Sequence, residues 1–398
     1  MAPIRTAIVG LSASAITSWA SSAHLPYLLS ARGRAKYTIV ALCNSSVDAA
    51  KRAIATYKLA PETRAYGDPQ ALADDEDIDL VVCCTRVDVH HQTILPSVKA
   101  GKSVFVEWPL AQDVAHAQEL VAAADASGSR SLVGLQGRVS PAVAQLRQLL
   151  HQRRIGKVLS SEVKAFGGSL DRQLLSSGLK YFTDLDVGGN IVTIGFGHCE
   201  IWGPATPPQS RSTDNCAYSH VLGDLTDVRA RLQLQRPEVK LRDASTGQVT
   251  DWTRSDVPDL VIAIGVLTAS DIAQEGATVL VSFRRGQPFL RSPGLVWTVN
   301  GEKGEIRLVA QGGPTLHSST YTEPVTLEVH DFQSDTVEPV GWSWDEWQTE
   351  LPINGRSIAT LYDLFAEGKA DGAVPSIEDA LARHVQLEKL LQTWPRSR

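Results

Sequence analysis

The sequence has few cysteines and no block of like charge. Its five cysteines are an odd number, lack the spacing of metal ligands, and include the adjacent pair Cys83-Cys84 inside an apolar run. This pattern favours reduced thiols in an intracellular compartment over a disulfide framework or a metal site. No run of lysine or arginine exceeds a pair such as Arg153-Arg154, and the net charge is −6. These features argue against direct binding of nucleic acid.

Long apolar stretches are also absent. No apolar run approaches the ~20 residues that a membrane span requires. No signal peptide precedes the apolar run that begins at Ile4. We therefore expect no membrane contact and a cytoplasmic location, or a nuclear one if the protein is a regulator.

The sequence does contain enough apolar material for a large core. With 398 residues, 43% of them hydrophobic and 21% charged, the chain is typical of a globular protein of two domains. Strand and helix patterns alternate through the first third, which predicts an α/β domain with a doubly wound parallel sheet over residues 1–135. Residues 136–398 are expected to form a second, α+β domain.

The first strand pattern leads into a turn made of small residues. The apolar run that begins at Ile4 ends at Gly10, and Ser12, Ala13 and Ser14 follow before an alanine-rich segment. Such a turn lets backbone N–H groups and a helix N-terminus approach a pyrophosphate, as in a Rossmann dinucleotide-binding unit. The usual second and third glycines are replaced, so the turn by itself is equally consistent with a strand-helix corner that binds nothing.

The second strand pattern, Tyr37–Cys43, ends at Asn44 and Ser45. An NAD site commonly has a carboxylate near this point for the ribose hydroxyls, and Asn44 carries no charge. With Lys51 and Arg52 close by, this strand end favours NADP over NAD. The alternative is that Asn44 is only a turn residue.

Further strand patterns end near Thr85 and at Glu107, and His90 follows Thr85 by five residues. The carboxyl ends of parallel strands share one edge of the sheet, where ligands bind. Gly10, Asn44, Thr85 and Glu107 all lie at such ends, and this convergence favours a cofactor site. Gln136 and Arg138 are candidates to contact cofactor or substrate, although Arg138 is equally suited to pair with a carboxylate or the backbone.

Several motifs resemble the Gfo/Idh/MocA oxidoreductase family. They are Thr85 with His90, Ala100–Ala111, Arg138–Pro141, Ile155–Val158, Gly188-Gly189, and Pro375-Ser376 before Glu378–Leu381. The resemblance covers nearly the whole chain. It implies NAD(P) as cofactor, a small-molecule substrate, and a second domain whose sheet covers the nicotinamide site with one face and often builds a homodimer or higher homo-oligomer with the other.

Two departures from the family pattern concern its catalytic groups. Trp108 stands where the family places a lysine between Glu and Pro, and indole has no titratable proton to offer in its place. Thr193 and Gly197 stand where an Asp and a His are usual, with His198 one residue beyond. These features resemble the fungal galactose-pathway co-repressors, a regulatory branch of the family, although Pro109 matches the enzymes more closely.

The second domain is expected to contain an open, mainly antiparallel sheet. Strand patterns recur at Val158–Phe166, Val228–Gln235, Ala277–Phe283, Leu295–Val299 and Ile306–Leu308, and Gly301–Glu305 reads as a hairpin turn. The stretch from Asn354 to Trp394 is helical in pattern and is expected to pack back near the first domain.

Titratable side chains in this half are candidate proton donors. His198 is the first, because imidazole titrates near working pH; its alternative is a histidine that only packs. Lys180 and Tyr181 form a second group, with a solvated loop as the alternative. The tryptophans Trp342, Trp344 and Trp347 are interpreted as packing residues, with a substrate pocket or an oligomer face as alternatives.

Two functions therefore fit the sequence. The first is an NAD(P)-dependent oxidoreductase that moves hydride between nicotinamide and a carbonyl, alcohol or imine carbon. The second is a non-catalytic regulator in which bound cofactor stabilises a conformation that a protein partner recognises. The enzyme is the favoured hypothesis, and no metal is expected.

Overall fold

The computed structural model describes residues 2–12, 18–167, 171–198, 221–368 and 374–395. The chain divides into two compact units. The first consists of residues 1–136 and 345–384, and the second of residues 137–344 and 385–398. No helix in the described ranges is long and apolar enough to cross a membrane.

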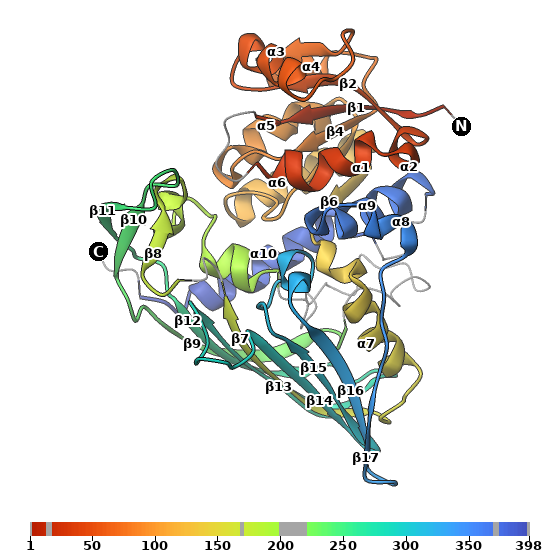
Figure 1. The fold of residues 1–398 in the computed structure, drawn as a ribbon, viewed down its shortest axis with the longest axis vertical. Helices are drawn as coiled ribbons and strands as arrows, with labels where there is room; N and C mark the ends of the chain where they lie inside the picture. The colour runs from red at the N-terminus through yellow and green to blue at the C-terminus, as the bar shows by residue number, and fades with distance from the viewer. Residues whose placement is uncertain (1, 13–17, 168–170, 199–220, 369–373, 396–398) are drawn as a thin grey trace. The chain divides into compact units, whose positions relative to one another are not determined.

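The first unit is built on a parallel sheet (Figure 1). Within the described residues its six strands lie in the order β3-β2-β1-β4-β5-β6, and every pair is parallel. The strands are β1 (Ile4–Val9), β2 (Tyr37–Cys43), β3 (Arg64–Tyr66), β4 (Leu80–Cys83), β5 (Ser103–Val106) and β6 (Ser131–Val133). Because helices cover both faces of such a sheet, its strands are nearly continuous apolar runs, and all four residues of β4 are buried.

The helices of the first unit begin and end at recognisable signals. Ser46 accepts a hydrogen bond from the backbone of α3, Asp113 does the same for α6, and Gly128, with φ +71°, ends α6. The helices are η1 (Ala20–His24), α1 (Leu25–Leu29), α2 (Ala31–Arg34), α3 (Val47–Thr56), α4 (Pro69–Ala73), α5 (Val87–Lys99), α6 (Val114–Ser127), α8 (Glu346–Thr349) and α9 (Ile353–Ala366). Helix α9 packs against η1 and α1.

The second unit contains a broad mixed sheet. In the described ranges eight strands lie in the order β17-β16-β15-β14-β7-β13-β12-β9; β7 and β13 are parallel and the other neighbours are antiparallel. The strands are β7 (Val158–Gly167), β9 (Leu225–Gln233), β12 (Leu260–Leu267), β13 (Ala273–Arg285), β14 (Leu295–Gly301), β15 (Gly304–Ala310), β16 (Val325–Asp331) and β17 (Thr336–Pro339). The predicted mainly antiparallel sheet is confirmed, and Glu302 and Lys303 form the predicted hairpin turn.

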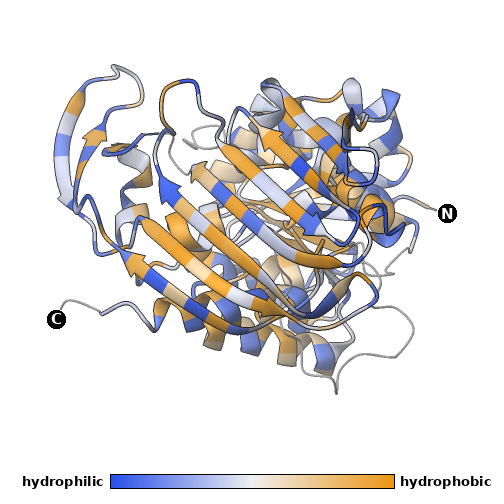
Figure 2. Ribbon diagram, turned by 90° about the horizontal axis from the view of Figure 1, so that it is seen from below, coloured by the Kyte–Doolittle hydropathy of each residue, from blue (hydrophilic) through white to orange (hydrophobic). Residues whose placement is uncertain are grey.

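The strands of this sheet alternate in burial. In β12, Val261 and Ala263 are buried, whereas Ile262 and Ile264 are 40% and 47% exposed. Leu280 of β13 lies directly opposite Ile264 and is 42% exposed. Figure 2 shows the corresponding hydrophobic and hydrophilic bands along the strands. One face of the sheet therefore packs in a core, and the other presents apolar side chains.

A smaller sheet and two longer helices complete the second unit. In the described residues a three-stranded sheet joins β11 (Val249–Arg254), β10 (Glu238–Arg242) and β8 (Leu174–Ser176). The helices are η2 (Gln136–Val139), α7 (Pro141–His151), η3 (Ser177–Thr183), η4 (Ile191–Phe196), η7 (Ser319–Thr322) and α10 (Ile377–Leu391). The unit boundary crosses α10 after His384, so this helix contributes to both units.

Candidate nucleotide-binding edge and candidate proton donors

The carboxyl ends of the parallel strands bring the predicted cofactor residues into one row. In sheet order, Asn44 follows β2, Gly10 follows β1, Thr85 lies two residues after β4, Glu107 follows β5 and Gln136 lies three residues after β6. The strand order reverses between β1 and β4, which is where open α/β sheets bind ligands. The first unit therefore has a complete candidate nucleotide edge.

Gly10 has a conformation that only glycine tolerates. Its φ is +88°, and a Cβ atom there would lie 2.9 Å from the carbonyl oxygen of Cys84. The Gly10 N–H donates to the Cys43 carbonyl (3.0 Å), while the Cys84 N–H donates to Val9 (3.0 Å). The turn is thus pressed against the start of the β4–α5 loop, in agreement with a tight phosphate turn.

Two side chains hold the backbone after Gly10. The Asn44 amide donates to the Leu11 carbonyl (3.0 Å), and the Tyr57 hydroxyl donates to the Ser12 carbonyl (3.1 Å). Asn44 therefore orients the turn, and Ser45 beside it is exposed. The predicted residues Ala13 and Ser14 lie outside the described residues.

His90 is buried and joins two loops of the edge. Its Nε2 lies 2.8 Å from the Thr85 carbonyl oxygen and its Nδ1 lies 2.9 Å from the Pro109 carbonyl oxygen. Burial lowers the pKa of His90, while the two backbone carbonyls oppose that shift. Both ring nitrogens are engaged, so His90 shapes the edge, and a direct bond to a cofactor would have to replace one of these contacts.

Glu107 is 8% exposed and is held by a residue that the sequence analysis did not single out. Its Oε1 lies 2.7 Å from Nε2 of His24, whose Nδ1 lies 2.9 Å from the Tyr362 hydroxyl. A Cβ atom at Gly134 would lie 2.6 Å from Glu107 Oε2, so the backbone after β6 closes the other side of the carboxylate. No local pattern predicts these contacts, because His24 lies 83 positions from Glu107 and 338 positions from Tyr362 in the sequence.

Trp108 is 5% exposed and its ring lies 4.7 Å from that of His384. The Ala111 N–H donates to Nε2 of His384 (3.4 Å), which requires an unprotonated nitrogen there. Burial lowers the pKa of His384 to about 4, so this imidazole is neutral at pH 7. The position after Glu107 therefore contributes an aromatic surface and no titratable proton.

Gln136 has a buried acceptor that suits a ligand. The side chain is 1% exposed, and its Oε1 has no hydrogen-bond partner among the described residues. A buried carbonyl oxygen without a donor is costly, so an amide N–H from a bound molecule would stabilise it. Arg138, two residues on, is 2% exposed, and its carbonyl accepts from Nη1 of Arg147 (3.5 Å).

The predicted proton donors lie in the second unit. His198 follows η4, and its ring lies against that of His317 in a tilted arrangement, with centroids 4.5 Å apart. Burial lowers the pKa of His317 to about 4, and its Nδ1 has no hydrogen-bond partner among the described residues. Lys180 is exposed and Tyr181 half-buried, both on η3. The structure thus brings His198 next to a second imidazole that the sequence analysis did not single out.

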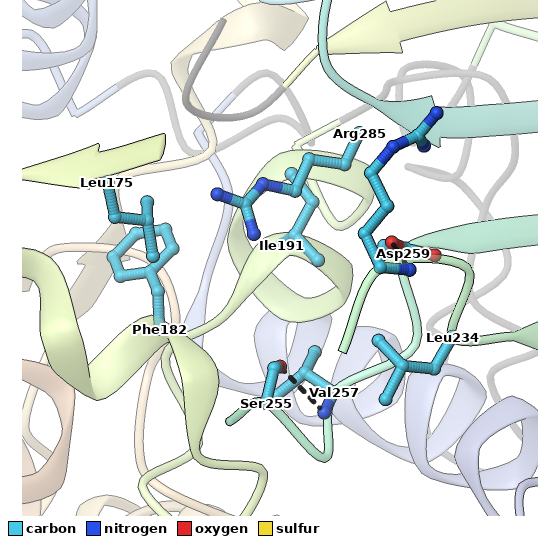
Figure 3. A pocket seen from close by; sticks show the side chains of 9 residues that line it. Leu175, Phe182, Ile191, Leu234, Ser255, Val257, Asp259 and Arg285 are labelled. Atoms are coloured by element: carbon cyan, nitrogen blue, oxygen red, sulfur yellow. Dashed lines mark hydrogen bonds between the residues drawn. The ribbon is translucent and has the colours of Figure 1, made fainter. Parts of the chain in front are cut away.

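A small pocket lies beside η3 and contains a buried arginine (Figure 3). The Arg285 side chain extends into it, and Ile191, Leu175 and Phe182 line it. Its free volume of about 10 Å³ holds one water molecule, which excludes it as a substrate pocket. Burial lowers the pKa of Arg285.

The three tryptophans belong to two different units. The rings of Trp342 and Trp344 lie 5.1 Å and 5.2 Å from Tyr321 in the second unit. Trp347 belongs to the first unit, where the Arg32 guanidinium lies 4.4 Å above its ring.

Comparison with known proteins identifies the two halves. Residues 4–135 match GFO_IDH_MocA, the oxidoreductase family with an NAD-binding Rossmann fold, and residues 141–202 and 210–310 match the C-terminal domain of Gal80p. The amino-terminal third of the chain belongs to the Gfo/Idh/MocA family. Its second half is of the Gal80p type, as the resemblance in the sequence implies.

Relatives of this family member include a dehydrogenase and a regulator. The dehydrogenase aclE of Aspergillus oryzae is 27% identical over 392 residues, which cover 98% of this chain and 96% of that protein. The galactose/lactose metabolism regulatory protein GAL80 of Saccharomyces cerevisiae is 27% identical over 319 residues, covering 78% and 68%. A solved super-repressor mutant of Gal80p from that yeast shares the fold, with a TM-score of 0.81, 23% identity, and coverage of 98% and 96%.

Two family positions have new local roles in this member. Trp108 takes the place of the family lysine and packs on His384. Thr193, at the place of the family Asp, belongs to the cap of η4: its N–H donates to Asn190 Oδ1 (3.1 Å) and its hydroxyl to the Gly188 carbonyl (2.7 Å). Neither Trp108 nor Thr193 offers a group that titrates near neutral pH.

Three of the five cysteines lie within the described residues. Cys43, Cys83 and Cys84 are free, and burial raises the pKa of Cys43 and of Cys83 to about 11. Among the described residues, no group of three or more His, Cys, Asp or Glu side chains is arranged to hold a metal ion.

Proposed function

We propose that this family member is an NAD(P)-dependent oxidoreductase that transfers hydride between nicotinamide and a small carbonyl, alcohol or imine substrate. The observation that carries the proposal is the row of candidate cofactor residues in the described part of the sheet edge: a left-handed Gly10, a turn held by hydrogen bonds from Asn44 and Tyr57, a buried Glu107, and a Gln136 oxygen without a partner among the described residues. Similarity to a dehydrogenase over almost the full length supports it.

The residues of this edge fit a dinucleotide by their chemistry. The turn from Gly10 to Ser12 would face the pyrophosphate, and Gln136 would accept an N–H from the cofactor. Asn44 and Ser45 put no carboxylate at the end of β2, and Lys51 and Arg52 are exposed on α3. The absence of a carboxylate and the nearby positive charges of Lys51 and Arg52 favour a cofactor with a 2′-phosphate. NADP is therefore the proposed cofactor.

His198 is the proposed proton donor. The bound nicotinamide supplies the hydride, and the His198 imidazole supplies a proton to the substrate oxygen or nitrogen. The adjacent His317 is neutral at pH 7 because burial lowers its pKa to about 4, so it does not place a second positive charge against His198. Tyr181 and Lys180 are the alternative donors.

The first test is titration with NADPH and NADH, followed by nicotinamide fluorescence, and then addition of a panel of aldehydes, ketones, imines and sugars. Oxidation of bound cofactor by a panel member is expected. His198→Asn should keep the NADPH affinity and lower kcat by about 100-fold or more, as loss of a general acid does. His330→Asn, an exposed histidine of the same unit, is the matched control. Wild-type turnover in the His198 variant would contradict its role.

A second candidate function is a regulator that binds NAD(P) without catalysis. The observation that favours it is Trp108, which removes the family's lysine and leaves no titratable group at that position. Tight NADPH binding without oxidation by any panel member, together with capture of a protein partner that depends on NADPH, would replace the enzyme with this function.

We also propose that the exposed face of the large sheet packs against a second copy of the chain. Ile262, Ile264 and Leu280 make it apolar, and their burial would stabilise a dimer. Sedimentation velocity should show a homodimer or higher homo-oligomer that Ile264→Asp converts to monomer. A monomeric wild type would overturn this proposal.

A further inference from the structure

A buried chain of hydrogen bonds reaches the nucleotide edge from helix α9. Tyr362, His24 and Glu107 are linked in that order by contacts of 2.9 Å and 2.7 Å. An ionised Glu107 only accepts, so Nε2 of His24 carries the hydrogen. In the neutral imidazole, Nδ1 is then an acceptor, and the Tyr362 hydroxyl donates to it. The chain therefore runs in one direction, towards the carboxylate.

The surroundings allow this arrangement little freedom. His24 and Tyr362 are fully buried, and the Phe105 ring lies 4.9 Å from His24 and 5.0 Å from Tyr362. On its other side the Glu107 carboxylate packs against the backbone at Gly134. Apolar neighbours exclude competing water, so His24 is the group that sets the orientation of the carboxylate.

Glu107 lies at the sheet edge that carries the candidate cofactor residues, so its negative charge can act on a bound cofactor. It ends β5, the strand next to β4, at the edge where the order of strands reverses. A fixed carboxylate there attracts a cation more than a neutral molecule. The oxidised nicotinamide ring is cationic, and the reduced ring is neutral.

We propose that His24, oriented by Tyr362, is a positioning residue that holds the Glu107 carboxylate towards the nicotinamide, so that this edge favours the oxidised over the reduced cofactor. The inference rests on the NAD(P) binding of the proposed function, and it holds for the enzyme and for the regulator. A histidine that only filled the core would affect folding without changing the preference between the two redox forms.

The test is the ratio of the Kd for NADP⁺ to the Kd for NADPH, measured by calorimetry on the full chain. Glu107→Gln, which removes the charge, should raise the ratio roughly 5-fold to 10-fold, as expected for one charge at several Å in a partly hydrated site. His24→Leu should raise it almost as much. His24→Gln keeps an N–H donor and should stay within about 2-fold of the wild type.

Tyr362→Phe and Tyr37→Phe form a matched pair. Both hydroxyls are buried in the same aromatic cluster, but that of Tyr37 donates to the Tyr362 carbonyl (2.6 Å) and that of Tyr362 contacts His24. Tyr362→Phe should raise the ratio, and Tyr37→Phe should leave it unchanged. Thermal unfolding would reveal whether His24→Leu folds. If it does not, the two tyrosine variants still test whether the hydrogen bonds that lead to Glu107 affect the ratio.

Three outcomes would overturn the proposal. A wild-type ratio in a folded His24→Leu, or equal ratios in the two tyrosine variants, would show that His24 does not position the charge. A wild-type ratio in Glu107→Gln would show that the charge does not act on the nicotinamide. A wild type that binds neither dinucleotide would remove the proposed function as well, and this result differs from the others because it appears before any variant is made.

Discussion

The strands of the two large sheets differ in how many of their apolar side chains are buried. In the first unit, β4 is buried along its whole length, because helices cover both faces of the parallel sheet. In the second unit, β12 alternates between buried and exposed residues, because one face of the sheet is open. Substitutions should therefore act through burial in the first sheet and through surface chemistry in the second.

The comparison extends to polar side chains. In the first unit the polar groups near the strand ends are hydrogen-bonded inward: Asn44 to Leu11, His90 to a backbone carbonyl, and Glu107 to His24. On the open face of the second sheet, Arg307 pairs with Glu328 in water-exposed positions. The same residue types thus build a rigid binding edge in one unit and a solvated surface in the other.

The largest difference between the two sheets is expected in the free energy of unfolding when one buried and one half-exposed apolar residue are each replaced by serine. Val82→Ser puts a hydroxyl among fully buried neighbours and removes apolar volume, and should lower the free energy of unfolding by about 4 kcal/mol. Ile264→Ser, at a position that is half-exposed in the single chain, should cost less than about 1 kcal/mol at protein concentrations low enough to keep the chain monomeric. Urea midpoints with unchanged m-values measure both; equal losses would contradict the contrast.

A second contrast concerns two glycines with positive φ. Gly10→Ala adds strain at φ +88° and a contact of 2.9 Å with the Cys84 carbonyl, and should cost about 3 kcal/mol and weaken NADPH binding. Gly247→Ala has a similar φ of +72° but open space around it, and should cost about 1 kcal/mol. Thermal unfolding measures the stability of both variants. An equal loss of stability would show that the close approach of Gly10 to the Cys84 carbonyl does not add to the cost of the substitution.

Acid should destabilise both units through one buried histidine each. Burial lowers the pKa of His384 and of His317 to about 4, below the ordinary value of about 6.5 in the unfolded chain. The unfolded state binds a proton first, so stability is full above pH 6.5 and falls as the pH drops towards 4. At pH 5 each histidine should cost about 2 kcal/mol relative to pH 7.5.

Urea unfolding at a series of pH values checks this expectation. His384→Gln and His317→Gln should each flatten the curve between pH 6.5 and pH 5. Curves parallel to that of the wild type would show that these histidines are protonated in the folded protein.

The smallest effect should come from the open face. Arg307 and Glu328 are 2.7 Å apart, but their side chains are 54% and 31% exposed. In the monomeric Ile264→Asp variant, Arg307→Ala should change the free energy of unfolding by less than about 0.5 kcal/mol, and added salt should not enlarge the change. A loss above that range at the urea midpoint would contradict a solvent-screened ion pair on this face of the single chain.

Local patterns were sufficient for much of the fold. The apolar run up to Cys83 predicts a buried parallel strand, and the recurring strand patterns of the second half predict an open, mainly antiparallel sheet. Strand ends share an edge in such a sheet, so Gly10, Asn44 and Glu107 were found without coordinates. The motifs that resemble the Gfo/Idh/MocA family indicated the same fold and the same candidate cofactor edge.

Contacts between distant segments were beyond those patterns. His24 lies in a run of small and apolar residues, and nothing near it shows that its ring meets Glu107 and Tyr362. The side chain of Asn44 was considered for the cofactor, and its bond to the Leu11 carbonyl depends on a turn 33 positions away. The strand β11 was not predicted because its residues are mostly exposed and polar.

The division of the first unit between two stretches of chain has a consequence for its synthesis. Tyr362 and Asp363 contact His24, Tyr27 and Tyr37, yet more than 200 residues separate the end of the first stretch at 136 from the start of the second at 345. On the ribosome the amino-terminal stretch emerges long before those partners are made. The hydrogen bond between His24 and Tyr362 can then form only when translation is nearly complete, so a nascent chain would complete the support of Glu107 late.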